Sequence, residues 1–281
     1  KPLTQSLFQE MKARIKEDDS SVPQKDGDWL YWSKFEEGMQ YRQHWRKAVS
    51  GDEDQLMLDE NELAEGKEYF RLGAASVSPD GRLLAYSETS EIRLVPTDNP
   101  LAEPILVSAR QTGREYDVEE HDGTLYILTN DDHVNFRLAT ASIAGPDNWA
   151  TLVAGSDEFY LTDVCTFKNF YVTEGRENGL DQIEIRSYDD PAKVERIVFP
   201  EASYSAGLDD NPEYDVDKLR LSYDSMVTPG TVFDYHLADK SLETLKVQEI
   251  PSGYDAGQYV TERLMIEVRD GAIVPVSLGY R

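Results

Sequence analysis

The chain is poor in features that mark disulfide-linked or membrane-embedded proteins. It has a single cysteine, Cys165, among 281 residues, so an internal disulfide framework is excluded. We expect Cys165 to be a buried strand residue within Leu161–Phe167 rather than a reactive thiol. No apolar run approaches the roughly 20 residues that a membrane helix needs, and no signal-peptide pattern opens the chain. These absences predict a cytoplasmic protein.

The motifs of most enzyme classes are absent as well. The sequence has no G-x-S-x-G nucleophile elbow, HExxH, paired cysteine ligands, P-loop or dinucleotide fingerprint. Its four histidines are spread over different parts of the chain, and none stands beside a candidate serine nucleophile. We therefore predict that this stretch holds no catalytic residue, metal ligand or cofactor. Asp131 and Asp132 could bind a cation with Asp117 or Glu119, but without EF-hand spacing an acidic surface loop is favoured.

Positive charge is scarce. The chain has 28 Lys and Arg against 54 Asp and Glu, a formal net charge of −26. Phosphates would be repelled, so nucleic acids and anionic membranes are not expected partners. Two interpretations of the negative charge stay open. It could reflect adaptation to salt or a solvated acidic surface, or it could steer a basic substrate electrostatically. A hydrophobic content of 40% supports a folded core.

What the chain does have is a repeated turn followed by a short apolar strand. In 77–87 (VSPDGRLLAYS) the residues Pro79, Asp80 and Gly81 supply a tight turn between two strands. Similar turns precede apolar strands at Asp26-Gly27, Asp122-Gly123, Lys168-Asn169 and Asp217-Lys218. A repeat of roughly 40 to 50 residues built of short strands is typical of propeller blades.

Each repeat has room for four strands, and five repeats can be recognised. In the last three repeats we expect strands over these ranges: 115–119, 124–129, 136–142, 149–153; 160–166, 169–174, 182–187, 194–199; 204–208, 218–223, 231–237, 241–248. Earlier strands are expected at 28–35, 41–49, 53–61, 83–87, 92–95 and 101–107. Gly, Pro, Asn and Asp interrupt these runs every few residues, which excludes helices. The predicted fold class is all-β, a β-propeller of four-stranded blades.

The two ends of the chain differ from the repeats. Leu7, Met11 and Ile15 form the apolar stripe of an amphipathic helix that must dock elsewhere. Residues 251–255 form a linker, and 259–269 and 273–280 form a hairpin about Asp270-Gly271.

Several segments in order resemble oligopeptidase B (protease II), a serine peptidase of the prolyl oligopeptidase family. They cover nearly the whole chain: 17–23 (EDDSSVP), 36–41 (EEGMQY), 58–64 (LDENELA), 77–81 (VSPDG), 128–132 (LTNDD), 135–138 (NFRL), 228–235 (TPGTVFDY), 253–255 (GYD) and 270–278 (DGAIVPVSL).

The resemblance implies a seven-bladed propeller that caps an α/β-hydrolase domain carrying Ser, Asp and His, in an enzyme that cuts short peptides after Arg or Lys. Residues 1–23 would hold the helix that packs on the hydrolase domain, 24–250 the propeller, and 251–281 the first hydrolase strands. The propeller would gate access for short basic peptides, opening near Val22-Pro23 and Gly253-Tyr254. Loop position alone suggests Glu36, Glu37, Arg42, Asp131 and Asp132 as gating residues.

This sequence departs from the family pattern in two places. It ends at Arg281, before the region expected to carry the triad. In the family, segments like 83–87 and 89–94 are separated by further blade sequence, whereas here they adjoin, so we expect one to two blades to be absent between Ser87 and Thr89. The alternative to a peptidase fragment is a stand-alone binding or scaffold propeller. A propeller glycosidase with paired carboxylates is a third, weaker alternative.

Overall fold

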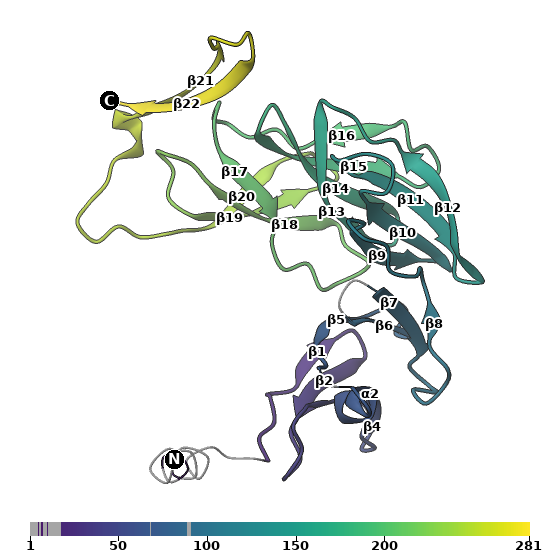
Figure 1. Cartoon of the computed structure of the whole chain (residues 1–281). Helices are drawn as coiled ribbons and strands as arrows, with labels where there is room; N and C mark the ends of the chain where they lie inside the picture. The colour runs from purple at the N-terminus through teal and green to yellow at the C-terminus, as the bar shows by residue number, and fades with distance from the viewer. Residues whose placement is uncertain (1–4, 6, 8–9, 11–17, 68, 89–90) are drawn as a thin grey trace. The chain divides into compact units, whose positions relative to one another are not determined.

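The computed structural model describes residues 5, 7, 10, 18–67, 69–88 and 91–281 (Figure 1). It forms two compact units, residues 1–107 and 108–281. Of the expected N-terminal helix, Gln5, Leu7 and Glu10 are helical, while Met11 and Ile15 lie outside the described residues. None of the helices formed by the described residues has the length and hydrophobicity that a membrane span requires.

The first unit contains two four-stranded antiparallel sheets, each with its strands in chain order. Their strands are β1 (Gln24–Asp26), β2 (Trp29–Lys34), β3 (Gln43–Ala48) and β4 (Gln55–Asp59), then β5 (Leu72–Val77), β6 (Leu83–Glu88), β7 (Glu91–Pro96) and β8 (Ile105–Leu106). A short helix, α2 (Glu60–Ala64), follows β4, and the Asp59 carboxylate caps it by accepting from the Asn61 N–H. β8 is shorter than predicted, because Pro100 and Pro104 lack the N–H that a sheet requires.

The turn that organises the sequence forms as predicted. The Gly81 N–H donates to the Ser78 carbonyl at 2.8 Å, and Gly81 adopts φ +70°, a conformation that glycine reaches without a steric penalty. The Asp80 carboxylate accepts from the Arg82 N–H at 3.0 Å. The turn is also held from the neighbouring sheet, because the buried Arg46 of β3 donates to the Gly81 carbonyl at 2.8 Å.

The second unit contains three further sheets of the same topology and a hairpin. Their strands are β9 (Tyr116–His121), β10 (Thr124–Thr129), β11 (Arg137–Ser142) and β12 (Gly145–Val153); β13 (Phe159–Thr166), β14 (Phe170–Glu177), β15 (Leu180–Ser187) and β16 (Val194–Arg196); β17 (Ser205–Leu208), β18 (Lys218–Asp224), β19 (Thr231–His236) and β20 (Leu242–Val247); β21 (Val260–Glu267) and β22 (Ile273–Tyr280). A 3-10 turn (Ala256–Gln258) precedes β21. The prediction of an all-β chain of four-stranded propeller blades is confirmed, with five such sheets in the described residues.

Two hairpins of this unit turn through only two residues with positive φ. Asp122 and Gly123 (φ +46° and +78°) join β9 to β10, and Asn178 and Gly179 (φ +52° and +73°) join β14 to β15. Such turns match the right-handed twist of the strands they connect, so they fix the register of both pairs.

Apolar side chains fill the space between consecutive sheets. Leu128, Leu138 and Tyr171 belong to a buried cluster between the β9–β12 and β13–β16 sheets, and Phe170 and Leu219 belong to another between the β13–β16 and β17–β20 sheets. The first strands of two of these sheets, β9 and β13, lie next to each other, and both carry acidic side chains.

Candidate functional site: unpaired carboxylates on the first strands

Acidic side chains gather on the first strands of the second unit. Asp117 and Glu119 lie two residues apart on β9, so they share one face of the strand. Asp163 lies on β13, the first strand of the next sheet. The Thr166 hydroxyl, also on β13, donates to Glu119 Oε2 at 3.3 Å and to the Glu120 carbonyl at 2.9 Å. These bonds bring the acidic face of β9 against β13.

Two further carboxylates extend the group to the third sheet. Glu174 Oε1 of β14 accepts from the Leu208 N–H of β17 at 2.7 Å, and Asp181 Oδ2 of β15 accepts from the Ala206 N–H at 3.2 Å. A Cβ atom on Gly207 would lie 3.0 Å from Glu174 Oε1, so the missing side chain lets the carboxylate approach this closely. Carboxylates thus span the seams between all three sheets.

The described residues place no lysine or arginine in an ion pair with Asp117, Glu119, Asp163 or Glu174. Burial raises the pKa of Glu119 to about 7; the Thr166 hydrogen bond opposes this rise, and the charges of Asp117 and Asp163 add to it. Burial also raises the pKa of Glu174 to about 7, with the Leu208 N–H opposing. Asp163 is exposed, yet the protein around it disfavours its charged form and raises its pKa, with the charge of Asp117 adding to the rise. Asp117, Glu119, Asp163 and Glu174 therefore carry negative charge that no ion pair offsets, whereas Asp181, at the end of the group, pairs with Arg176 at 2.9 Å.

Cys165 lies among these carboxylates on β13. Burial, followed by the charges of Glu119, Asp163 and Glu174, raises the pKa of its thiol to about 12. Because the thiolate is the nucleophilic form, this environment keeps the thiol unreactive at neutral pH. Cys165 lies on a strand as expected, but it is partly rather than fully buried.

The arrangement suits binding of a cation rather than covalent chemistry. Within the part of the chain that the structure describes, no three His, Cys, Asp or Glu side chains are placed to hold a metal ion. The carboxylates accept hydrogen bonds from one hydroxyl and from backbone N–H groups, which leaves acceptor capacity for an incoming donor. An Arg or Lys side chain, or a peptide N-terminus, has the matching charge.

The five predicted gating residues occupy the same kind of loop in two different sheets. Glu36, Glu37 and Arg42 lie between β2 and β3 in the first unit, and Asp131 and Asp132 lie between β10 and β11 in the second. Each loop joins the second strand of its sheet to the third. Glu36 pairs with Lys34 at 3.3 Å, and the Arg42 guanidinium lies 5.1 Å from the centre of the Phe35 ring.

Asp131 has a structural partner. Its two oxygens accept from Arg137 Nε and Nη2 at 2.7 and 2.8 Å. This hydrogen bond, and the charge of Arg137, hold the pKa of Asp131 below its usual value. The interpretation of Asp131 as part of an acidic surface loop fits this geometry better than a cation site with Asp117 or Glu119.

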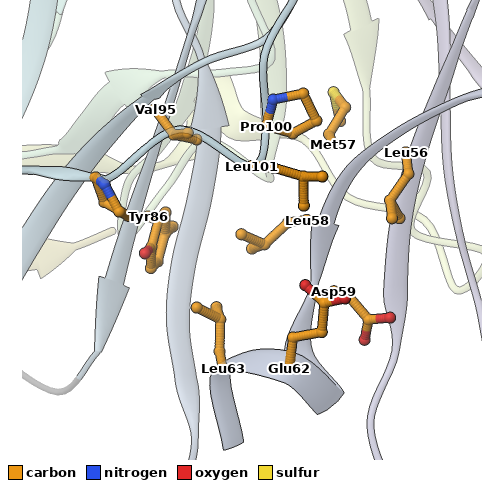
Figure 2. Close-up of a pocket in the computed structure, with 11 residues that line it drawn as sticks. Leu56, Met57, Leu58, Asp59, Glu62, Leu63, Tyr86, Val95, Pro100 and Leu101 are labelled. Carbon is orange, nitrogen blue, oxygen red and sulfur yellow. The ribbon is translucent and has the colours of Figure 1, made fainter.

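An apolar hollow in the first unit is a separate feature (Figure 2). It has a volume of about 60 Å³ and lies at the seam between β4 and α2 on one side and β6 and β7 on the other. Figure 2 shows Leu58, Leu63 and Tyr86 around it, with the carboxyls of Asp59 and Glu62 at one end. The Asp59 carboxylate is already bonded to Gln43 and Asn61. This hollow is a packing seam with no chemistry of its own.

Sequence reasoning named Asp117 and Glu119 only as partners of a loop, and it passed over Asp163, Glu174 and Asp181. A signal was present, because D-x-E in β9 and D-x-C in β13 place polar residues on one face of a strand that opens a repeat. Glu174 carries no such signal, because its contact with β17 crosses from one sheet to the next.

Comparison with known proteins identifies the family. The profile described as prolyl oligopeptidase, N-terminal beta-propeller domain, matches residues 1–91 and 87–248. Dipeptidyl aminopeptidase BI of Pseudoxanthomonas mexicana is 29% identical over 400 residues, covering 100% of this chain and 55% of the relative. Protease 2 of Moraxella lacunata is 29% identical over 259 residues, covering 90% of this chain and 36% of the relative.

Solved structures agree on the fold. Oligopeptidase B from Trypanosoma brucei, in a closed form with covalently bound antipain, aligns with a TM-score of 0.67 at 22% identity over 100% of this chain and 55% of its own. Oligopeptidase B from Leishmania major aligns with a TM-score of 0.65 at 20% identity, covering 99% of this chain and 55% of its own. The chain spans about half the length of these proteins or less. With the five four-stranded sheets, these matches show that the chain belongs to the N-terminal β-propeller domain family of prolyl oligopeptidase.

Proposed function

We propose that this chain is the non-catalytic propeller region of an oligopeptidase B-like serine peptidase that cleaves short peptides after Arg or Lys. The observation that carries the proposal is the group of carboxylates on β9, β13 and β14, which lacks cationic partners. In a propeller the blades surround a central channel, and the first strand of each blade lies nearest to it. These carboxylates would therefore face the path of an incoming peptide.

The physical role of the group is electrostatic steering combined with steric exclusion. A narrow path lined by one sign of charge raises the local concentration of cationic ligands. Folded proteins are too wide to enter, so short basic peptides are admitted selectively. The gating residues Glu36, Glu37, Arg42, Asp131 and Asp132 belong to this proposal as loop positions at the rim, with Asp131 acting only through its pair with Arg137.

The domain limits are part of the same proposal. Residues 1–23 connect to the hydrolase domain, 24–250 form the propeller, and 251–281 start the hydrolase domain. The catalytic Ser, Asp and His would lie in sequence beyond these 281 residues, so we expect this stretch alone to hydrolyse no Arg ester or amide. Hydrolysis that persists through purification and is blocked by a serine-directed inhibitor would contradict this.

One or two blades are proposed to be absent between Ser87 and Thr89. Two observations support this: the family profile matches in two stretches that meet at residues 87–91, and the alignment with dipeptidyl aminopeptidase BI runs over 400 residues although this chain has 281. The shorter alignment with Protease 2 needs no such gap. Intact mass spectrometry of the natural protein is the test. A mass equal to the 31.9 kDa of this chain would contradict both the proposed hydrolase domain and the proposed absent blades.

The binding role is tested by calorimetry on this chain with two tetrapeptides that differ only in Arg against citrulline. We expect the Arg peptide to bind and the neutral one to bind at least tenfold more weakly, with the difference shrinking in high salt. Affinity should also rise from pH 6 to pH 8, because Glu119 and Glu174 ionise near pH 7. The double variant Asp117→Asn/Glu119→Gln should weaken binding, while Glu158→Gln, an exposed carboxylate on the same unit, should not.

Equal affinity for both peptides would contradict steering by these carboxylates. In the full-length peptidase the same double variant should raise KM for basic peptides while leaving kcat unchanged. An altered kcat would assign the group a role in the chemical step instead.

A further inference from the structure

The C-terminal hairpin β21–β22 is held to the preceding sheets by polar contacts centred on one carboxylate, Glu201. Glu201 lies between β16 and β17 and is half-buried. Its Oε1 accepts from the hydroxyls of Tyr223 and Thr228, and its Oε2 accepts from Ser225 at 2.7 Å and from Thr261 at 3.2 Å. Three of these hydroxyls belong to the fifth sheet and its loop, whereas Thr261 belongs to β21.

The direction of these bonds is fixed by the other contacts of the hydroxyls. Ser225 Oγ already accepts from the N–H groups of Val227 and Thr228, at 3.0 and 2.8 Å, so its proton is available for Glu201. Burial, and next the charge of Glu201, raises the pKa of Tyr223, so its phenol keeps its proton and donates. Each oxygen of the carboxylate therefore accepts two hydrogen bonds, which uses both of its lone-pair directions.

Other polar contacts join the hairpin to the β13–β16 sheet and to the segment between β16 and β17. Ser203 donates to the Ser277 hydroxyl of β22, and Arg263 of β21 donates to Ser277 at 3.2 Å and to the Asn178 carbonyl at the β14–β15 turn. A Cβ on Gly279 would lie 3.1 Å from the Met226 Cβ. The hairpin thus meets the sheets through a few small groups.

Apolar burial contributes little to this attachment. Within 249–281 no residue is fully buried, and large side chains remain exposed, among them Val260 (53%), Met265 (50%) and Ile273 (63%). The contacts between the hairpin and the preceding sheets are therefore mainly polar, and a joint with few buried apolar contacts opens at a lower free energy than the core. The hydrogen bonds centred on Glu201 decide how firmly the hairpin is held to the sheets.

We propose that Glu201 is a latch: it holds the β21–β22 hairpin on the fifth sheet through Thr261, and breaking that bond releases the hairpin as a unit without unfolding the sheets. This regulatory role does not depend on peptide binding, and it places the moving joint of the propeller end at Glu201 rather than in the linker 251–255 alone. Figure 1 shows the hairpin in yellow following the fifth sheet.

Two isosteric variants test the latch by hydrogen–deuterium exchange with mass spectrometry. Thr261→Val removes the one hydroxyl that the hairpin gives to Glu201. Thr228→Val removes a hydroxyl that reaches the same carboxylate from the sheet side. We expect Thr261→Val to speed exchange in 260–267 and 273–280 by about tenfold, with less than a twofold change in β14 and β15. Thr228→Val should leave exchange in the hairpin within about twofold of the wild type.

A third variant, Glu201→Gln, tests the hub itself. The amide offers one acceptor oxygen in place of two, so at least two donors lose their partner, and exchange in the hairpin should rise at least as much as in Thr261→Val. The proposal is overturned if Thr261→Val leaves exchange in the hairpin unchanged, if both threonine variants act alike, or if exchange rises equally in β14 and β15.

Discussion

In the second unit, the acidic side chains named on the first strands β9 and β13 differ from those on the third strands β15 and β19 in whether a cation lies beside them. On the third strands β15 and β19, Glu184 and Asp234 are almost completely buried, with side chains 4% and 1% exposed, and each has cationic partners. Glu184 meets Arg186 and Arg196, and Asp234 meets Lys218 and Arg220. On the first strands, Asp117, Glu119 and Asp163 have no ion pair among the described residues.

The consequence is opposite protonation behaviour. A hydrogen bond from Arg220, and further contacts with Lys218, lower the pKa of Asp234 although burial opposes them. Burial raises the pKa of Glu119 because it disfavours the charged form of the carboxyl. No Lys or Arg among the described residues forms an ion pair with Glu119 that would oppose this rise. Removing one partner of a buried ion pair is strongly destabilising. Among the carboxylates without a cation, Asp117 and Asp163 are exposed and Glu119 is half-buried, and a desolvated carboxylate with a shifted pKa, as at Glu119, is a candidate functional group. The contrast separates structural carboxylates from candidate functional ones within one unit.

The largest effect is expected at Glu184. Glu184→Ala would leave Arg186, whose side chain is only 11% exposed, without its carboxylate, and we expect a loss of about 3 kcal/mol in the free energy of unfolding. Urea denaturation at pH 7 measures it. Glu177→Ala is the matched control, since Glu177 pairs with the same Arg196 at 2.7 Å but is 37% exposed, and it should cost less than about 1 kcal/mol. Equal losses would remove the distinction between buried and exposed pairs.

The opposite sign is expected at Glu119. The unfolded chain ionises this carboxyl near 4.5 and the folded chain near 7, so its contribution to stability is full below pH 4.5 and is lost as pH rises through 7. Glu119→Gln keeps an acceptor for Thr166 and carries no charge, so it should stabilise the protein by about 1 to 2 kcal/mol at pH 8 and by little at pH 5.

Thermal unfolding at the two pH values checks this, with Glu158→Gln as the exposed control. A variant that is destabilised equally at pH 5 and pH 8 would show that the Glu119 carboxylate is not desolvated, and the contrast between the strands would fail at that point.

A smaller effect is expected at Asp131. Its folded pKa lies below the ordinary 3.8 because of Arg137, so its contribution is present above pH 3.8 and is lost as pH falls below that value. Asp131→Asn should cost about 1 kcal/mol at pH 7. The difference from the wild type should shrink as pH falls toward 3, measured by denaturant unfolding across that range. A cost that stays constant with pH would point to lost packing instead of a lost ion pair.

The smallest effect concerns Cys165. With its pKa near 12, the thiol should react with a water-soluble disulfide reagent at pH 8 at least a hundredfold more slowly in the folded protein than in urea. The variant Glu119→Gln/Glu174→Gln removes two of the charges that raise this pKa, so it should speed labelling severalfold. No acceleration in this variant would leave burial as the sole cause.

Much of the architecture could be predicted from local sequence. Turn residues such as Pro79-Asp80-Gly81 and Asp122-Gly123 restrict the backbone within four residues, and apolar alternation over five or six residues marks a strand. Both signals act between neighbours in the chain, so strand positions and the four-strand repeat followed. β8 departs from its predicted range of 101–107, because the prolines that precede it restrict pairing to two residues.

The candidate site could be predicted less well from the sequence. Loop position singled out Asp131 and Asp132, yet Asp131 is committed to Arg137, six residues along the chain. The contacts that build the acidic group and the latch join residues far apart in the chain: Glu174 and Leu208 are 34 positions apart, and Glu201 and Thr261 are 60 positions apart. No pattern in one sequence reports such contacts.

The strands, the tight turns, the excess of negative charge and the repeat that makes each sheet can all be read from the chain alone, because they depend on backbone preferences and on short-range polarity. Which carboxylates have a cation beside them depends on how the sheets pack. The pKa and the energetic role of an acidic residue depend on burial and on neighbours from other sheets. Glu184 and Glu119 are the same residue type on strands of the same fold, and packing alone makes one a structural ion pair and the other an unpaired charge.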